Sequence, residues 1–366
     1  MQKTIRQNSK SLFTNVSLVF SLMLLLVVPA CKKPPHHNNF DDLKNFNVVK
    51  LVANTSAYNA ARVDPNFING WGLSFSPSGV VWASSEGTGL SEIWDKTGNQ
   101  LAPAVSIPTH GDKLAGGHPS GQVFNGTTDF KLPNGNPARF IFAGLDGIIS
   151  GWNGGPAAVA AVDDSESGAV YSGIAMGSSG GKNYLYVANF SERKIDVYDK
   201  DWNEVDMPFK EYDLPSGYSP FNIQNIDGNL YVMYAKLGAN GDEEKGVGKG
   251  FVDIFKPNGL LMKRFASQGS LNAPWGIAKA PAIFWDDIDL TNRILVGNFG
   301  DGRINVFDKL GKFRGQLRSA HNVIEIEGLW GISFAPATAT ATDPGWLYFA
   351  AGPNDEGDGL FGYIEK

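Results

Sequence analysis

The sequence has little cysteine and histidine, with one cysteine and five histidines among 366 residues. These few side chains form no recognisable pairing of a nucleophile with a base, so the sequence gives little support to an enzyme of that kind. Beyond the first thirty residues no long apolar stripe has the 3.6-residue period of a helix, which argues against extensive helix. Basic clusters are also missing, and the net charge of -6 argues against nucleic acid as a partner.

Turn-forming and apolar residues are abundant instead. The chain contains 44 glycines and 20 prolines, as a succession of short strands joined by turns requires. Hydrophobic residues make up 42% and aromatic residues 12% of the chain, which is enough for a large buried core. The length exceeds that of an average domain, but all-β barrels and propellers often run long as one unit.

The first thirty-one residues have the layout of an export signal. Lys3, Arg6 and Lys10 give a positive start, and residues 16–28 form an apolar run too short for a comfortable membrane span. The string Val-Pro-Ala-Cys that ends at Cys31 resembles a lipobox, after which a bacterial peptidase cuts and the cysteine receives a lipid. We predict a lipoprotein signal peptide over residues 1–30. A plain secretory peptide with an incidental cysteine is the alternative.

The residues after the signal predict a membrane-attached tether. Lipidated Cys31 would leave no thiol for disulfides or metal sites, because it is the only cysteine. Residues 31–46 are polar and contain paired prolines, so we expect a flexible tether. Lys32 after the cysteine resembles lipoproteins that go on to the outer membrane. The predicted location is the cell envelope, with the membrane face left open.

A repeat of about fifty residues runs through the rest of the chain. A short strand with a small or polar residue beside an aliphatic one recurs six times, at positions 72, 122, 173, 222, 276 and 331. The steps between these positions are 50, 51, 49, 54 and 55 residues. A second apolar strand follows in each unit, at 80–83, 140–143, 184–187, 230–233, 294–297 and 347–350. Six four-stranded units of this size predict a six-bladed β-propeller.

The last unit ends after its third strand, and this predicts how the ring closes. Residues 48–52, which precede the first unit, supply the missing outer strand, and we expect them to pair with residues 359–364. The predicted propeller therefore spans residues 47–366. A seven-bladed ring would need a unit for which the spacing leaves no room, and a sandwich would not repeat at fifty residues.

Five strings in the repeat region are distinctive, at residues 142–153, 216–224, 271–278, 295–302 and 328–332. Together they resemble a known family of exported bacterial conserved hypothetical proteins. This family is similar to NHL-repeat and TolB-like six-bladed propellers, so the resemblance implies that fold and an exported location. Some of its members carry a PEP-CTERM sorting tail, which this sequence does not show, and lipid attachment is expected to replace it. The resemblance implies no catalytic residues.

Loops at one face of the predicted ring carry polar and aromatic residues that could form a site. We predict ligand binding by Trp71, Asn222, Trp275, Glu327 and Trp330. Glu86, Asn189, Asn298 and Asp301 offer oxygen ligands of the kind that suits Ca²⁺, by analogy with six-bladed lactonases. For any single one of these residues, packing between blades or capping of a turn is the alternative role.

The acidic and glycine-rich segment 241–250 superficially resembles a phosphate-binding loop. It lacks the Gly-Lys-Ser/Thr end of that motif, so we predict a mobile insertion in blade four with weak affinity for cations.

The preferred function is a non-catalytic module that binds a small molecule or a protein at the channel face and is attached to the membrane by its lipid. The alternative is a metal-dependent hydrolase, such as a lactonase. Fold analogy alone supports that alternative.

Overall fold

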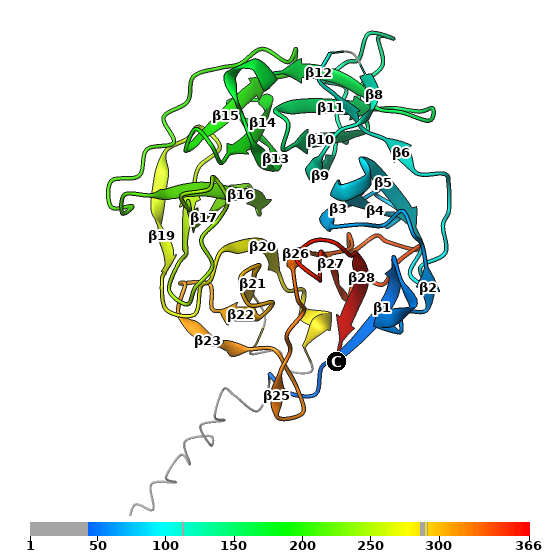
Figure 1. Cartoon of the computed structure of the whole chain (residues 1–366). Coiled ribbons are helices and arrows are strands. Elements are labelled where there is room, and N and C mark those ends of the chain that lie inside the picture. The colour runs from blue at the N-terminus through cyan, green and yellow to red at the C-terminus, as the bar shows by residue number, and fades with distance from the viewer. Residues whose placement is uncertain (1–42, 112, 286–289, 291) are drawn as a thin grey trace, which may run out of the picture. The chain divides into compact units, whose positions relative to one another are not determined.

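Six antiparallel sheets are arranged in a ring around a central axis (Figure 1). The computed structural model describes residues 43–111, 113–285, 290 and 292–366. Within these residues the secondary structure consists of strands and four single-turn 3-10 helices, and no helix is long and apolar enough to cross a membrane. The predicted six-bladed β-propeller is confirmed. The predicted signal peptide, Cys31 and the tether as far as residue 42 lie outside the described residues.

Each blade begins with an inner strand at the axis and proceeds outward. Blade one consists of β3 (Gly70–Phe75), β4 (Val81–Ser85), β5 (Leu90–Trp94) and β6 (Val105–Ser106). Blade two consists of β9 (Pro119–Phe124), β10 (Phe140–Gly144), β11 (Ile148–Trp152) and β12 (Val159–Asp163). Blade three has β13 (Tyr171–Ser179), β14 (Lys182–Asn189) and β15 (Lys194–Asp199). Its fourth position is held by a single bridge between Tyr198 and Glu204.

The remaining blades complete the ring. Blade four consists of β16 (Tyr218–Ile226), β17 (Asn229–Lys236), β18 (Phe251–Phe255) and β19 (Leu261–Ser267), and blade five of β20 (Pro274–Lys279), β21 (Ile294–Asn298), β22 (Ile304–Phe307) and β23 (Phe313–Gln316). Blade six consists of β26 (Leu329–Phe334), β27 (Leu347–Ala351), β28 (Leu360–Glu365) and the N-terminal strand β1 (Asn47–Ala53). The short strands β2 (Arg62–Val63), β7 (Pro108–Thr109), β8 (Lys113–Gly116), β24 (Arg318–Ser319) and β25 (Asn322–Val323) lie at the edges and in loops.

The two ends of the propeller pair with each other, as the sequence predicts. Strand β1 runs antiparallel to β28, with Asn47 opposite Glu365 and Ala53 opposite Leu360 (Figure 1). The side chain of Asn54 extends this seam by donating to Asp358, at 2.7 Å. Because the last sheet is completed by the beginning of the chain, unfolding either end exposes the edge of the other.

A ring of close contacts between neighbouring inner strands, which we call the collar, explains the fifty-residue repeat. It consists of one residue from each inner strand, namely Gly72, Gly121, Gly173, Asn222, Gly276 and Gly331. A Cβ atom on Gly276 would lie 2.6 Å from the carbonyl oxygen of Trp330, and one on Gly331 would lie 2.5 Å from that of Trp71. All six inner strands also have a register irregularity at this level. At the five glycine positions neighbouring blades thus approach each other through backbone, which only a residue without a side chain permits.

Asn222 is the exception in the collar, and its side chain fills the place that glycine leaves elsewhere. Its Nδ2 donates to the carbonyl oxygen of Trp275 in blade five, at 2.9 Å, and its Oδ1 fits against Gly173 in blade three. The collar narrows the central channel to a space of only about 20 Å³.

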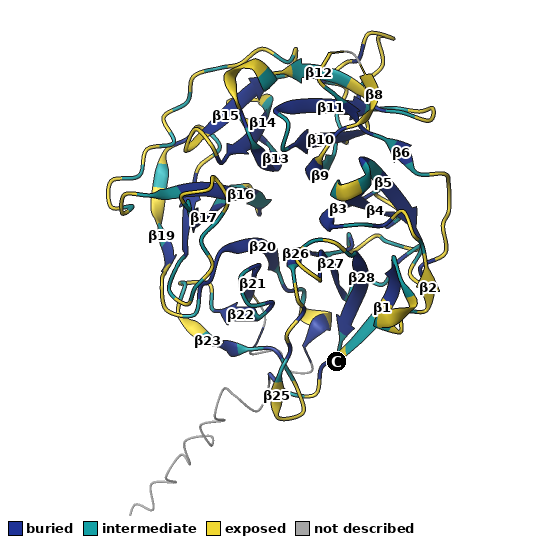
Figure 2. Cartoon of the chain, viewed as in Figure 1, coloured by how far each residue is buried: buried dark blue, intermediate teal, exposed yellow. Residues whose placement is uncertain are grey.

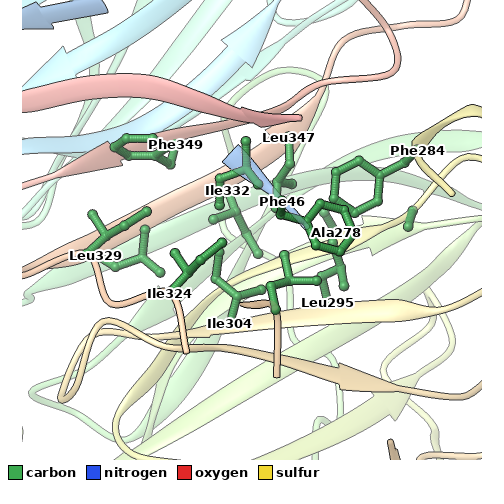
Figure 3. Close-up of a cluster of buried hydrophobic side chains, with 14 of the residues drawn as sticks. Phe46, Ala278, Phe284, Leu295, Ile304, Ile324, Leu329, Ile332, Leu347 and Phe349 are labelled. Atoms are coloured by element: carbon green, nitrogen blue, oxygen red, sulfur yellow. The ribbon is translucent and has the colours of Figure 1, made fainter. Parts of the chain in front are cut away.

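Buried apolar side chains fill the space between blades, where the strands are covered on both faces (Figure 2). The cluster between blades five and six includes Phe46, which packs among Phe284, Ile332 and Leu347 (Figure 3). Phe46 is fully buried and Leu43 is 2% exposed. Packed chain therefore begins before residue 47, inside the segment that the sequence predicts to be tether.

Candidate functional site

A cavity of about 550 Å³ lies where the inner strands begin, on one face of the ring. We call it the mouth cavity. Its lining comes from five blades: Trp71 and Glu86 from blade one, Leu145 from blade two, Val170, Ser172 and Phe190 from blade three, Phe221 and residues 240–243 and 245 from blade four, and Trp330, Asp355 and Glu356 from blade six. Such a site depends on closure of the ring, because these residues are far apart in sequence.

Aromatic rings pack together at the base of this cavity. The aromatic cluster comprises Trp71, Phe190, Phe221, Trp275, Phe299 and Trp330. Trp330 stacks on Trp71 at a centroid distance of 3.6 Å and on Phe299 at 3.7 Å, and Trp275 meets Trp330 edge-on at 6.0 Å. Three of the tryptophans sit next to a collar glycine, so the close approach of the inner strands brings the indoles together.

The three indole N–H groups are not equivalent. Trp275 donates to the carbonyl oxygen of Ser172 at 2.9 Å, and Trp330 donates to Oδ1 of Asn69 at 3.0 Å. Trp71 is only 4% exposed, and its indole nitrogen has no hydrogen-bond partner within the described part of the chain. A buried unpaired donor costs about 1–3 kcal/mol, so such groups call for a functional explanation.

Asn69 fixes two carboxylates and one indole at once. Its Nδ2 donates to Oε2 of Glu86 and to Oε2 of Glu356, both at 2.9 Å, while its Oδ1 accepts from Trp330. The residue is 2% exposed and has a φ of 50°, a left-handed conformation that asparagine tolerates better than most residues. Glu86 is held from the other side by Nδ1 of His118, at 2.7 Å. Asn69 therefore links the loop of blade one to the loop of blade six.

The blade-four insertion contributes the opposite wall. At its base Glu244 pairs with Lys236 at 2.7 Å and with Lys249 at 2.5 Å, and these ammonium groups lower the pKa of Glu244 to about 2. The next residue, Lys245, places its ammonium 4.2 Å from the centre of the Phe299 ring. Asp242, Glu243 and Lys245 thereby line the mouth cavity. The predicted insertion is present in blade four, and in this structure it forms part of the site.

Two of the cavity carboxyl groups have raised pKa values. Burial is the main cause for Glu243, and the nearby Glu356 and Asp242 add to it, so its pKa rises to about 7. Burial also raises the pKa of Glu356, against the opposing effects of the hydrogen bond from Asn69 and the charge of Lys245. Both groups resist ionisation mainly because burial removes them from water, and the negative charge of neighbouring carboxylates adds to this effect.

The residues predicted to bind a ligand occupy different levels of the channel. Trp71 and Trp330 line the mouth cavity, and Trp275 belongs to the same aromatic cluster. Asn222 lies in the collar, is 3% exposed and bonds to the neighbouring blade. Glu327 is exposed and accepts a hydrogen bond from the backbone of Asn354, outside the cavity lining. The structure thus brings the three tryptophans together and leaves Asn222 and Glu327 apart from them.

The residues predicted to bind calcium take part in three separate local networks. Asn189 bonds to Glu192 and Asp196 in blade three, Asn298 bonds to Ser270 and Asp301 in blade five, and Glu86 belongs to the Asn69 network. Among the described residues no three His, Cys, Asp or Glu side chains form a group that could hold a metal ion. The calcium site stays a prediction.

Sequence reasoning missed Asn69 and Glu356 and assigned the blade-four acids to a mobile loop. The run Asp242-Glu243-Glu244 beside Lys245 was a usable signal, since charged residues in an insertion near a channel often contact ligands. Asn69 gave only a weak signal, because a single asparagine before a strand usually caps a turn.

Two other hollows are larger but involve fewer blades. One of about 820 Å³ lies at the far ends of the inner strands of blades four to six and includes Ile283, Phe334 and Pro344. Another of about 670 Å³ lies between blades one and two and includes Trp82, Leu101 and Trp152. Both have mainly apolar linings, whereas the mouth cavity combines carboxylates, an ammonium and indoles.

Comparison with known proteins gives relatives by sequence. The uncharacterized protein L690 of Acanthamoeba polyphaga mimivirus is 31% identical over 328 residues, covering 84% of this chain and 82% of the relative. The uncharacterized protein R648 of the same virus is 30% identical over 321 residues, covering 84% and 77%. The chain belongs to the same family as these proteins. No family model matches. Because these members are viral, the bacterial and exported character of the family stays a prediction.

This chain shares its fold with solved propellers of low sequence identity. A streptogramin B lyase structure is similar with a TM-score of 0.52 and 14% identity, covering 88% of this chain and 98% of that chain. A protein of unknown function from Bacteroides thetaiotaomicron is similar with a TM-score of 0.54 and 11% identity, covering 87% and 76%. These likenesses show the six-bladed fold.

Proposed function

We propose that this chain is a binding module that takes a small organic molecule into the mouth cavity. The observation that carries the proposal is the construction of the cavity from loops of five blades, with a volume of about 550 Å³. Small-molecule sites commonly occupy roughly 300–1,000 Å³ and combine an apolar lining with a few fixed polar groups. The mouth cavity has both, in the aromatic cluster and in the carboxylates that Asn69 holds.

Two features favour binding over a purely structural role for these residues. A turn-capping side chain makes hydrogen bonds to backbone groups of its own loop. Asn69 instead donates its amide N–H groups to carboxylates from two different blades. The half-buried carboxylates carry a desolvation cost that a scaffold could avoid by using neutral side chains. Carboxyl groups whose pKa is raised by burial in a cavity, as for Glu243 and Glu356, are typical of functional sites.

We also propose that the module is displayed in the cell envelope through a lipid on Cys31. The support is the apolar run and the lipobox-like string at the start of the sequence. Expression of the chain in a bacterial host should place it in the membrane fraction. Cys31→Ser should shift it out of that fraction, and an unchanged distribution would contradict the lipid anchor.

The site proposal is tested by filling the cavity. Leu145→Trp adds bulk to a lining residue, and Leu101→Trp makes the same change in the hollow between blades one and two. We expect ligand-observed NMR with a library of small aromatic compounds to give hits on the full chain in mild detergent. Leu145→Trp should weaken these hits about ten-fold or more, an effect of about 1.4 kcal/mol, while Leu101→Trp leaves them unchanged. Hits lost only in Leu101→Trp would overturn the proposal.

A further inference from the structure

We propose that the ligand of the mouth cavity carries an organic cation, an amine or a quaternary ammonium group, on an apolar body. This inference rests on the proposed function and names the chemical class of its ligand. Three independent properties of the cavity support it: the balance of charge, the aromatic surface and the position of the protein's own ammonium group.

The charge on the cavity lining is strongly one-sided. Five carboxyl groups line it, from Glu86, Asp242, Glu243, Asp355 and Glu356, against the single ammonium of Lys245. These carboxyl groups come from three blades, so ring closure forces them together. Glu356 and Asp242 raise the pKa of Glu243, and Glu86 and Asp242 raise that of Glu356. A bound cation would relieve this repulsion, whereas a bound anion would increase it.

The aromatic cluster supplies the second half of a cation site. The face of an aromatic ring attracts an ammonium group electrostatically, and surrounding carboxylates add to that attraction. Lys245 already demonstrates this arrangement, because its ammonium lies 4.2 Å from the centre of the Phe299 ring while its charge acts on Glu243 and Glu356. Within this chain, therefore, an alkylammonium lies over one ring of the aromatic cluster and acts electrostatically on two of the cavity acids.

An organic cation fits this geometry better than a bare metal ion. The described residues contain no three His, Cys, Asp or Glu side chains that could converge on one metal. The carboxyl groups instead surround a cavity of about 550 Å³ whose base consists of stacked indoles. The indoles of Trp71 and Trp330 offer no oxygen ligands to a hard cation, but their apolar surface in the cavity lining suits the apolar body of an amine.

The charge balance predicts how affinity depends on pH. With a pKa of about 7, Glu243 is protonated and neutral in acid and becomes negative as the pH rises. The charged groups that act on Glu243 are Asp242 and Lys245 on the same insertion and Glu356 on the blade-six loop. Glu86 in turn acts on Glu356. The affinity for a permanent cation should therefore increase from pH 6 to about pH 8 and then level off. Glu243→Gln should remove most of this dependence.

Three probes of similar size and different charge test the inference. Phenethylamine is the cation, 2-phenylethanol the neutral analogue and 3-phenylpropanoate the anion, titrated by calorimetry into the full chain in mild detergent at about pH 8. We expect the amine to bind about ten-fold more tightly than the alcohol and the carboxylate to bind weakest. Phenyltrimethylammonium, whose charge does not titrate, serves for the pH series.

Matched variants separate charge from shape. Glu356→Gln and Glu243→Gln should each weaken amine binding about five-fold and leave the alcohol unchanged, and Lys245→Gln should strengthen amine binding. Glu204→Gln, at an exposed glutamate on the outer edge of blade three, should have no effect. Equal binding of amine and alcohol would overturn the inference and leave the proposed function standing. No binding of any of the three at about 10 mM, together with no effect of Leu145→Trp on library hits, would overturn both.

Discussion

The collar residues and the residues one position before them differ in what constrains their identity, although they are neighbours on the same six strands. At the collar the residue is glycine in five blades and asparagine in one, and in every blade it touches the next blade. One position earlier the residues are Trp71, Ser120, Ser172, Phe221, Trp275 and Trp330. The position that repeats is fixed by the close approach of backbones. The side chain at the position that varies is free of that constraint, and four of these residues, Trp71, Ser172, Phe221 and Trp330, line the mouth cavity.

The largest expected effect comes from breaking the collar. Gly331→Ala would place a Cβ atom 2.5 Å from the carbonyl oxygen of Trp71, so blades six and one must move apart. We expect a loss of about 3 kcal/mol in the free energy of unfolding, measured by chemical denaturation. Gly126→Ala is the control, because its Cβ would meet nothing closer than 3.5 Å. Equal stabilities of the two variants would show that the collar does not hold the blades together.

An intermediate effect on stability, with a large effect on binding, is expected at Asn69. Asn69→Gly keeps the left-handed backbone accessible and removes the hydrogen bonds to Glu86, Glu356 and Trp330. We expect a loss of about 2 kcal/mol in stability and a loss of about ten-fold in amine affinity, because the two carboxylates are no longer held. A loss of stability with unchanged affinity would show that Asn69 serves the scaffold alone.

The smallest effect on stability should come from substituting Asn222, the one collar residue that is not glycine. Asn222→Gly makes the collar uniform and removes one hydrogen bond to Trp275, so we expect a loss of about 1 kcal/mol in stability. Amine affinity should not change, because the side chain lies below the mouth cavity. Weaker amine binding in this variant, measured by the same calorimetry, would instead support the role in ligand binding that the sequence predicts for Asn222.

The architecture was predictable because the collar leaves a signal in the sequence. A small residue that must recur once per blade gives steps near fifty residues, and its six occurrences determine the number of blades. Strand β1 was also predictable, since the sixth unit lacks an outer strand. Docking of Phe46 between blades five and six was not, because a lone aromatic in a polar segment has no periodic pattern that marks it as buried.

The site was only partly predictable for a related reason. The tryptophans precede collar positions, so the repeat places them together. The meeting of Glu243 in blade four with Glu356 in blade six depends on how far an insertion reaches across the ring, and no local pattern encodes that distance. Asn189 and Asn298 were predicted as ligands because they come at the ends of strands, but the same positions suit turn capping, and both make hydrogen bonds within their own loops.

The most direct test of the central claim uses the nine tryptophans as reporters. The full chain, labelled with ¹⁵N at its indole nitrogens, would be titrated with phenethylamine while the indole N–H signals are followed by NMR. We predict that the signals of Trp71 and Trp330 at the mouth cavity shift, while those of Trp82 and Trp152, in the hollow between blades one and two, remain in place. Shifts confined to Trp82 and Trp152 would contradict the claim that the channel mouth is the binding site.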